Sequence, residues 1–480
     1  MRLVRRSVWR AFLGAATLAC LEASAQTPPI QDVLKDLRAI ESASYRGDAD
    51  RLRIAYQEQQ KSRPGDPMLK VYLAWFSMPS DQSWNALKAI TAFHADNPWA
   101  HLGMARIYTH WKKMRGPAQT ELDEILKKTP GFYPALVGEG DLLRAEGDWA
   151  KAAARYREAL ALSNDAEAHA GLGLALASAG DAAAAKPELE RALALWPDQP
   201  EALRALARVA RDSRDLAATA RSLNLLSALV PRDAAVLKEL AGVEKSLGHL
   251  AAAAAAYERY AKVASVDAAS LRDLAFLYRE LKQPESESRA LHQLMALEPD
   301  EASHAIRLAE LADEQGAPEE AETLLAQAVE REPKRGEVWL KLARVRAQRD
   351  EPREALQAYR AAAAAGERSG DGEAAELQKR FQLPPKPARG SINQISQSVQ
   401  GNLNAFFRER LKSRPGLSGT LKLRVRVDPA GRVLAVEVLE DTVGDGLLAG
   451  HAFFSLADAV FPPTRREPVF QFDLKPPKGK

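Results

Sequence analysis

Two sets of basic residues recur along this chain at a constant interval. Successive members of each set are separated by the same number of residues. The spacing along the chain between the two sets places both on the same face of a helix. Such side chains bind anions, and arginine offers carboxylates paired hydrogen bonds. The sets are Arg204, Lys238 and Arg272, and Arg211, Lys245 and Arg279. We therefore expect a cationic ladder that could hold an acidic peptide, a terminal carboxylate or an anionic polysaccharide.

A solvated surface is the alternative interpretation of this cationic ladder. Acidic residues lie beside it in the sequence and could neutralise it, namely Asp212, Glu239, Asp273 and Glu280. Exposed charges contribute little to folding, so helices can carry them without a partner. Both interpretations stay open from the sequence.

A repeat of about 34 residues positions the ladder. Turn residues recur at this interval, at Gly180, Arg214, Gly248, Lys282, Gly316 and Asp350. Small residues that permit close helix contact keep the same step, at Gly173, Ala207, Ala241, Ala275, Ala309 and Ala343. Helix-ending residues do so too, at Pro197, Pro231, Ser265, Pro299 and Pro333. Three positions in one phase predict a single structural unit repeated along the chain.

This unit resembles the tetratricopeptide repeat, a helix-turn-helix that stacks on copies of itself. The resemblance implies a mainly α protein, a right-handed solenoid of roughly ten units over residues 33–369, with a shortened unit around 101–132. In that family the first helix of each unit lines the concave groove where peptides bind. One large residue on each second helix should fill the space between neighbours, at Tyr156, Leu189, Leu223, Tyr257, Leu291, Leu325 and Tyr359.

The repeat also gives structural interpretations to other suggestive stretches. The glycine-rich stretch at 171–180 contains a helix-packing residue, Gly173, and a turn residue, Gly180, and "RGD" at 46–48 falls on an earlier turn. Aromatic residues crowd the N-terminal part, at Tyr72, Trp75, Phe76, Trp84, Phe93, Trp99, Tyr108 and Trp111. A carbohydrate or peptide platform is one interpretation of these rings, and we favour core packing.

The composition changes after residue 369. Residues 370–390 contain Pro384, Pro385 and Pro387, which favour an extended linker. Helical spacing then predicts a helix over 391–412, followed by a β-hairpin that turns at 428–431, a helix over 447–460 and a last strand around Phe470. We therefore expect a small α+β domain over residues 391–476.

This order, with "RPGLSGTLKLRVRVDPAGRV", "TVGD" and "FPPTRREPVFQFDL", resembles the C-terminal domain of TonB-like proteins, in the variant named for AgmX and PglI. The resemblance implies an open strand edge that accepts a strand from a partner. Lys422, Arg424 and Arg426 alternate with apolar residues on the first hairpin strand, so they should form a basic outward face that takes part in partner binding. We take the strand around Phe470 as the candidate docking edge.

The segment 1–25 has the layout of a secretory signal peptide. A basic start and an apolar run precede Ala23-Ser24-Ala25, so an exported, periplasmic chain should begin at Gln26. A lipoprotein signal ending at Cys20 is the less favoured alternative, because Thr17 replaces the leucine usual at that position. Cleavage after Ala25 leaves no cysteine, and no later apolar run is long enough to span a membrane.

Composition and motifs limit the possible functions. A formal charge of +3 over 480 residues argues against nucleic-acid binding. The sequence holds no catalytic motif such as HExxH or GxSxG and no metal-ligand spacing, so we expect no enzyme and no cofactor. The prediction is a non-catalytic periplasmic adaptor for protein partners in a cell-envelope assembly for secretion, motility or surface-polysaccharide export. A TonB-like energy-transducing component and a polysaccharide-processing or polysaccharide-binding factor are the alternatives.

Overall fold

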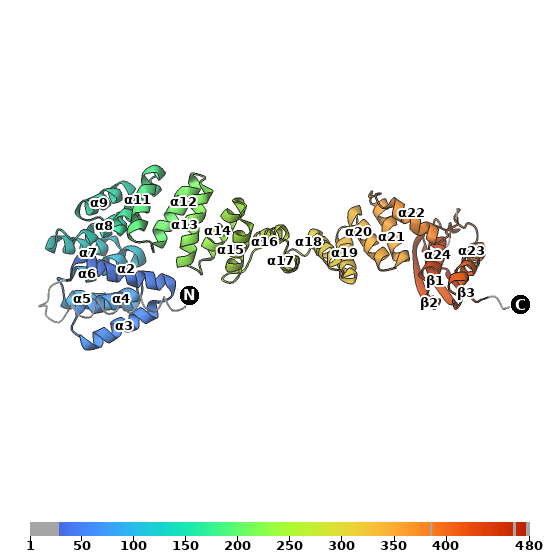
Figure 1. Ribbon diagram of the computed structural model, residues 1–480, viewed down its shortest axis with the longest axis horizontal. Coiled ribbons are helices and arrows are strands. Elements are labelled where there is room, and N and C mark those ends of the chain that lie inside the picture. Colours follow the sequence, from blue (N-terminus) through green and yellow to red (C-terminus); the bar gives the residue numbers. More distant parts are fainter. Residues whose placement is uncertain (1–27, 385, 464–466, 477–480) are drawn as a thin grey trace. The chain divides into compact units, whose positions relative to one another are not determined.

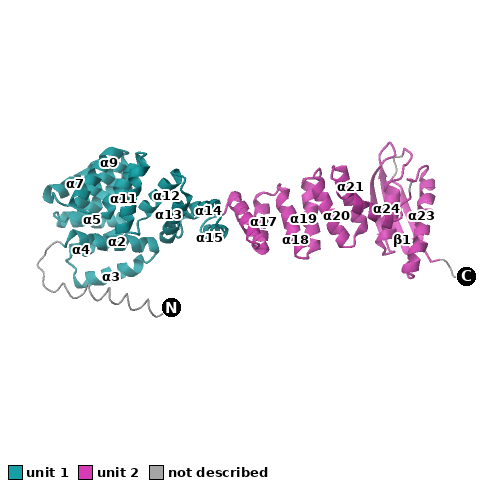
Figure 2. Cartoon of the chain, turned by 45° about the horizontal axis from the view of Figure 1, so that its top comes forward, with its two compact units in different colours: residues 1–265 teal, residues 266–480 magenta. Residues whose placement is uncertain are grey.

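The computed structural model describes residues 28–384, 386–463 and 467–476. The chain divides into two compact units, residues 1–265 and 266–480, which are described separately (Figure 2). The predicted signal peptide, with Thr17 and Cys20, lies outside the described residues. The described chain is mainly helical with a small antiparallel sheet near the C-terminus, which confirms the predicted fold class.

Unit 1 is built of helices that pair with their neighbours in sequence, from α2 with α3 to α14 with α15 (Figure 1). Its elements are α2 (Ile30–Arg46), α3 (Ala49–Ser62), α4 (Pro67–Phe76), α5 (Asp81–Phe93), α6 (Pro98–Arg106), the π-helix η1 (Ile107–Lys112), α7 (Arg115–Lys128), α8 (Tyr133–Ala145), α9 (Trp149–Leu162), α10 (Ala166–Ser178), α11 (Ala182–Leu195), α12 (Pro200–Asp212), α13 (Leu216–Leu229), α14 (Ala234–Ser246) and α15 (Leu250–Ala261).

Unit 2 continues the helix pairs and ends in the sheet. Its elements are α16 (Ala268–Glu280), α17 (Pro284–Leu297), α18 (Ala302–Glu314), α19 (Pro318–Arg331), α20 (Gly336–Gln348), α21 (Pro352–Ala364), α22 (Asp371–Arg380), α23 (Ile392–Ser413), β1 (Gly419–Val427), β2 (Val433–Asp441), α24 (Gly446–Ala457) and β3 (Val469–Leu474). Within the described residues, no helix has the length and apolar character needed to cross a membrane.

The turns between paired helices confirm the predicted repeat. Each predicted turn residue has a positive φ, which ends the first helix and redirects the chain into the second. The values are 89° at Gly180, 58° at Arg214, 77° at Gly248, 56° at Lys282, 75° at Gly316 and 57° at Asp350. Gly47 has a φ of 80°, so the "RGD" stretch is a turn, as predicted.

The packing positions also follow the prediction. The small residue on the first helix lies against the large residue on the second, and a Cβ atom on Gly173 would lie 2.7 Å from Cγ of Leu189. The predicted large residues from Tyr156 to Tyr359 are all buried. Most of the N-terminal aromatic residues belong to the core, as favoured: Tyr72, Trp75 and Trp99 are buried, and Phe76, Trp84, Tyr108 and Trp111 pack against them. Phe93 is 86% exposed.

The C-terminal sheet has the strand order β2-β1-β3, with both pairings antiparallel. Leu421, Leu423 and Val425 of β1 are buried, and α23 and α24 pack against the sheet. At the hairpin turn the Asp428 carboxylate accepts hydrogen bonds from the backbone N–H groups of Ala430 and Arg432, both at 2.9 Å. The predicted helix, hairpin, helix and strand are therefore present, and β2 and β3 are the edge strands.

The segment 370–390 differs from the extended linker expected there. Residues Asp371–Arg380 form α22, which packs on α21, and the following Phe381 is fully buried. The Phe381 ring lies 5.3 Å from that of Phe454 on α24, centroid to centroid. The prolines favoured an extended conformation in the prediction. The apolar contact of Phe381 and the helix-forming residues before it determine the observed conformation instead. The C-terminal domain is therefore packed against the last repeat.

Candidate functional site

Helix α2 contacts segments of unit 1 that lie far along the chain from it. Nε2 of Gln31 donates to Oη of Tyr133 at 2.8 Å, and the indole N–H of Trp196 donates to Oγ of Ser42 at 3.2 Å. Two ion pairs, Arg38 with Asp165 and Arg46 with Asp198, add to these contacts. The first helix of the array is thereby joined to the loops before α10 and α12.

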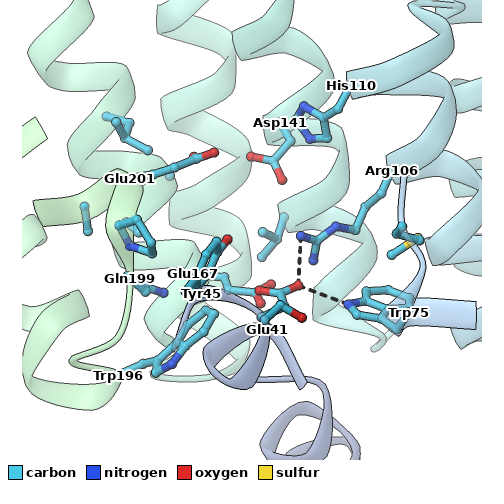
Figure 3. Close-up of a pocket in the computed structure, with 18 of the residues that line it drawn as sticks. Glu41, Tyr45, Trp75, Arg106, His110, Asp141, Glu167, Trp196, Gln199 and Glu201 are labelled. Carbon is cyan, nitrogen blue, oxygen red and sulfur yellow. Dashed lines mark hydrogen bonds and ion pairs between the residues drawn. The ribbon is translucent and has the colours of Figure 1, made fainter. Parts of the chain in front are cut away.

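A pocket of about 360 Å³ lies between α2 and these later helices (Figure 3). The side chains that line it come from α2, α4, α6, η1, α8, α10 and α12, with Met78 and Pro79 from the α4–α5 connection and Trp196 and Gln199 from the α11–α12 connection. These α-helices are the first members of their pairs, the helices that the repeat places in the groove. The closure by α2 therefore turns part of that groove into a pocket.

One wall of the pocket is held by hydrogen bonds to Glu41. Its Oε1 accepts from the indole N–H of Trp75 at 3.0 Å and lies 3.1 Å from Nη2 of Arg106. Burial alone would lower the pKa of Arg106, but Glu41, Glu167 and Asp141 outweigh that effect and raise it. Arg106 therefore stays charged, and this wall presents a neutralised ion pair.

The opposite wall carries a second group of charges. Oη of Tyr156 donates to Oδ1 of Asp141 at 2.7 Å, and Nη2 of Arg144 lies 3.4 Å from the same oxygen and 3.7 Å from Oε2 of Glu201. Figure 3 shows the carboxylates of Asp141 and Glu201 pointing toward each other. Burial lowers the pKa of His110 beside Asp141, so this histidine is neutral at pH 7.

Two further side chains of the pocket are buried at a cost in free energy that their neighbours only partly offset. Burial raises the pKa of Glu167 to about 7, and nearby Glu41 and Asp165 add to the shift while Arg106 and Arg38 oppose it. Gln199 is 6% exposed, and among the described residues no donor reaches its Oε1. The pocket therefore holds a carboxylate that is costly to ionise and a buried acceptor without a hydrogen bond.

The residues of the predicted cationic ladder lie outside this pocket. Arg204, Arg211, Lys238 and Lys245 belong to α12 and α14 of unit 1, and Arg272 and Arg279 belong to α16 of unit 2. The four arginines are paired with carboxylates, Arg204 with Asp233 at 2.8 Å, Arg211 with Glu239 at 2.7 Å, Arg272 with Glu298, and Arg279 with Glu287 at 3.0 Å. Lys238 Nζ lies 5.9 Å from the ring centroid of Tyr260. Ligand binding by the ladder stays a prediction.

The basic residues of the sheet lie on one face of its central strand. Lys422 and Arg424 are half-buried and Arg426 is exposed, opposite the buried side chains of β1. Nη1 of Arg424 lies 3.3 Å from a Glu437 carboxylate oxygen, and Lys422 is opposite Glu440 in the strand register. Acidic residues of β2 therefore offset the expected basic face, and its part in binding stays a prediction.

Sequence reasoning missed the pocket, although one signal was present. Glu167 and Glu201 are separated by the repeat interval and so occupy the same position in consecutive repeats, as do Glu41 and Trp75. Three or more histidine, cysteine, aspartate or glutamate side chains that could hold a metal ion do not gather anywhere in residues 28–384, 386–463 and 467–476.

Protein-family models match three segments of the chain. The matches are to models described as TPR repeat or tetratricopeptide repeat, at residues 140–180, 172–234 and 288–345. No curated protein sequence matches the chain.

Solved structures resemble the chain at low identity. The Cut9–Hcn1 hetero-tetramer of the APC/C is 17% identical, with a TM-score of 0.37, over 62% of this chain and 59% of that chain. PilF of Pseudomonas aeruginosa is 19% identical, with a TM-score of 0.35, over 44% of this chain and 97% of that chain. PilW, a type IV pilus biogenesis factor, is 20% identical, with a TM-score of 0.31, over 48% and 94%. By the matches to the family models, the helix pairs at residues 140–180, 172–234 and 288–345 are tetratricopeptide repeats.

Proposed function

We propose that this chain is a non-catalytic periplasmic scaffold that binds a protein partner in a cell-envelope assembly, with the pocket of unit 1 as its peptide site. The observation that carries the proposal is the closure of the groove by α2, which brings aromatic and charged side chains of several repeats around one pocket (Figure 3). Tetratricopeptide repeats are generally protein-interaction scaffolds. A pocket with aromatic and charged walls suits a peptide side chain that has both an apolar stem and a polar end.

The C-terminal domain supplies a second candidate docking site in this proposal. Its similarity to TonB-like domains supports strand addition at a sheet edge, and both β2 and β3 are edges of the described sheet. The pocket is the stronger candidate, because its aromatic and charged walls are already formed.

A photo-crosslinking amino acid placed at Ser44 tests the pocket directly. Ser44 is exposed on α2 and lines the pocket, whereas Glu190 is exposed on α11 and is absent from its lining, so Glu190 is the matched control position. We expect a crosslinked partner from position 44 and none from position 190, detected by mass spectrometry of envelope extracts. Equal crosslinking at both positions, or none at 44, would remove the pocket from the proposal.

The same preparation tests the compartment. N-terminal sequencing should find Gln26 as the first residue of the exported chain, as small-residue cleavage signals require. An acylated Cys20 would instead place the protein on a membrane surface.

A further inference from the structure

The charges that line the pocket of unit 1 do not balance. Four carboxylates, from Glu41, Asp141, Glu167 and Glu201, stand against the guanidinium groups of Arg106 and Arg144. The Arg106 guanidinium is held by Glu41 at 3.1 Å, and Arg144 is shared between Asp141 and Glu201 at 3.4 and 3.7 Å. The lining carboxyl groups therefore outnumber the guanidinium groups, and a bound cation would favour the ionised form of Glu167, whose pKa burial raises to about 7.

Gln199 gives an independent indication of what the pocket binds. Its side chain is buried in the pocket wall, since only 6% is exposed, and its Oε1 accepts no hydrogen bond from the described residues. A buried acceptor without a donor is costly, and a rotation of the terminal amide toward the pocket would let a ligand that donates hydrogen bonds remove the cost. Ammonium and guanidinium groups donate three and five N–H bonds, whereas a carboxylate ligand donates none.

Arg144 indicates a second feature of the ligand. Its Nε is buried and has no acceptor among the described residues. If the guanidinium group turns toward the pocket, a peptide carbonyl oxygen would satisfy this donor, and the backbone of any peptide supplies such oxygens. A cationic side chain together with its own backbone thus matches both orphaned groups.

The aromatic residues suit the stem of such a side chain. Tyr45, Trp75 and Trp196 line the pocket, and Tyr45 is 39% exposed. Lysine and arginine bury their methylene stems against apolar surface while their charged ends stay polar, and indole faces attract cations. Unit 1 already shows this geometry, because the guanidinium carbon of Arg38 lies 5.6 Å from the Trp196 ring centroid.

We infer that the pocket recognises a lysine or arginine side chain of a partner peptide, which would lie among Glu167, Gln199 and Glu201. This inference rests on the proposed function, because it specifies the chemistry of the peptide that the pocket binds. It also gives a role to Glu167, a carboxyl group that is costly to ionise unless a cation binds beside it.

Selection of peptides from a phage-displayed random library tests the inference with the full chain. The variant Ser44→Trp adds an indole to the pocket lining. Peptides that still bind this variant bind outside the pocket and are removed from the selection. We expect the pocket-dependent peptides to share a lysine or arginine. Replacing that residue by norleucine in a synthetic peptide should raise Kd by about tenfold or more, the loss expected for a buried charge pair.

Variants of the chain complete the test. Glu167→Gln combined with Glu201→Gln should raise Kd for the lysine peptide by about tenfold and leave Kd for the norleucine peptide unchanged, while Glu190→Gln should change neither. Circular dichroism checks the fold, and Glu201→Gln alone replaces the double variant if that fails to fold, because the Glu201 side chain is 74% exposed.

The outcomes separate the inference from the proposed function. Pocket-dependent peptides that lack lysine and arginine, or that bind the norleucine form equally well, would overturn cation recognition and leave the peptide site standing. Failure to recover any peptide that binds the unmodified chain more tightly than Ser44→Trp would overturn both.

Discussion

Glu167 shows how one side chain can link the chemistry of the pocket to the stability of unit 1. Charged groups act on its pKa from two helices besides its own, Arg38 and Glu41 on α2 and Arg106 on α6, and Glu201 on α12 lines the same pocket. Asp165, the N-cap residue of α10, adds negative charge from its own helix. The folded chain therefore holds a proton on Glu167 at a pH where the unfolded chain has lost it, since its pKa is raised to about 7 from an ordinary 4.5.

Replacing Glu167 by glutamine should change how stability depends on pH. Because the folded state binds more protons than the unfolded state between pH 4.5 and about 7, stability of the unmodified chain falls as pH rises through this range. The loss should be about 3 kcal/mol for this group. Glu167→Gln removes that contribution. The free energy of unfolding of the variant, relative to that of the unmodified chain, should therefore be higher at pH 8 than at pH 5. Urea unfolding at the two pH values measures the difference.

Glu190→Gln is the control for this measurement, because Glu190 is exposed on α11 of the same unit. It should leave the pH dependence of stability unchanged. An identical pH dependence in Glu167→Gln and in the unmodified chain would show that Glu167 ionises normally.

The turns between paired helices combine a fixed backbone conformation with varied residues. Gly248 and Lys282 occupy the same repeat position with φ values of 77° and 56°. A left-handed conformation is unfavourable for residues with a Cβ atom and nearly free for glycine. A Cβ atom on Gly248 would meet nothing within 4 Å, so this turn tests backbone conformation without steric contacts.

Lys282→Gly should therefore stabilise unit 2, and Gly248→Lys should destabilise unit 1. Each change should be about 0.5–1 kcal/mol, because the relief of left-handed strain exceeds the extra entropy of glycine in the unfolded chain. Denaturant unfolding monitored by circular dichroism measures both. Lys282→Ala keeps the Cβ atom, so its free energy of unfolding should be close to that of the unmodified chain. If Lys282→Ala is stabilised as much as Lys282→Gly, the lysine side chain and not the backbone is responsible.

The sequence predicts these helices and turns well, because each depends on residues close to it in the chain. Turn, cap and packing positions recur at the repeat interval, so one unit predicts the next. Helix α22 was not predicted, because prolines after it outweighed its own helix formers and the partner of Phe381 lies far along the sequence. The pocket was not predicted either, because its walls come from separate helices and its closure depends on contacts of α2 with distant segments, such as that of Ser42 with Trp196.

Unit 2 joins the last repeats and the C-terminal domain into one packed body. The two guanidinium nitrogens of Arg360 on α21 lie 2.9 and 3.1 Å from the carboxylate oxygens of Asp458, directly after α24. The carbonyl oxygen of Phe381 accepts from Nδ1 of His451 at 2.7 Å, and a Cβ atom on Gly450 would meet the Phe381 ring at 2.1 Å. The sheet domain therefore covers the end of the repeat array of this unit.

Phe381→Ala should weaken both parts of unit 2 together. Removing a fully buried aromatic ring leaves a cavity and should cost about 3–5 kcal/mol. Because the ring lies between α22 and α24, the backbone amides of α21 and of α24 should both exchange faster with deuterated solvent. Phe93→Ala, at an 86% exposed position, is the control and should leave exchange in unit 2 unchanged.

The pattern of exchange decides how the C-terminal domain is attached. An independent domain on a linker would lose protection in α23, α24 and the sheet, while α20 and α21 kept theirs. A cap on the array must transmit the loss to α21, because Arg360 would lose its partner Asp458 and the α21 surface that α24 covers would meet water. Protection that falls in α21 and α24 by similar amounts would therefore establish the domain as a cap. Docking at β2 or β3 would then take place on a surface held rigidly against the last repeat.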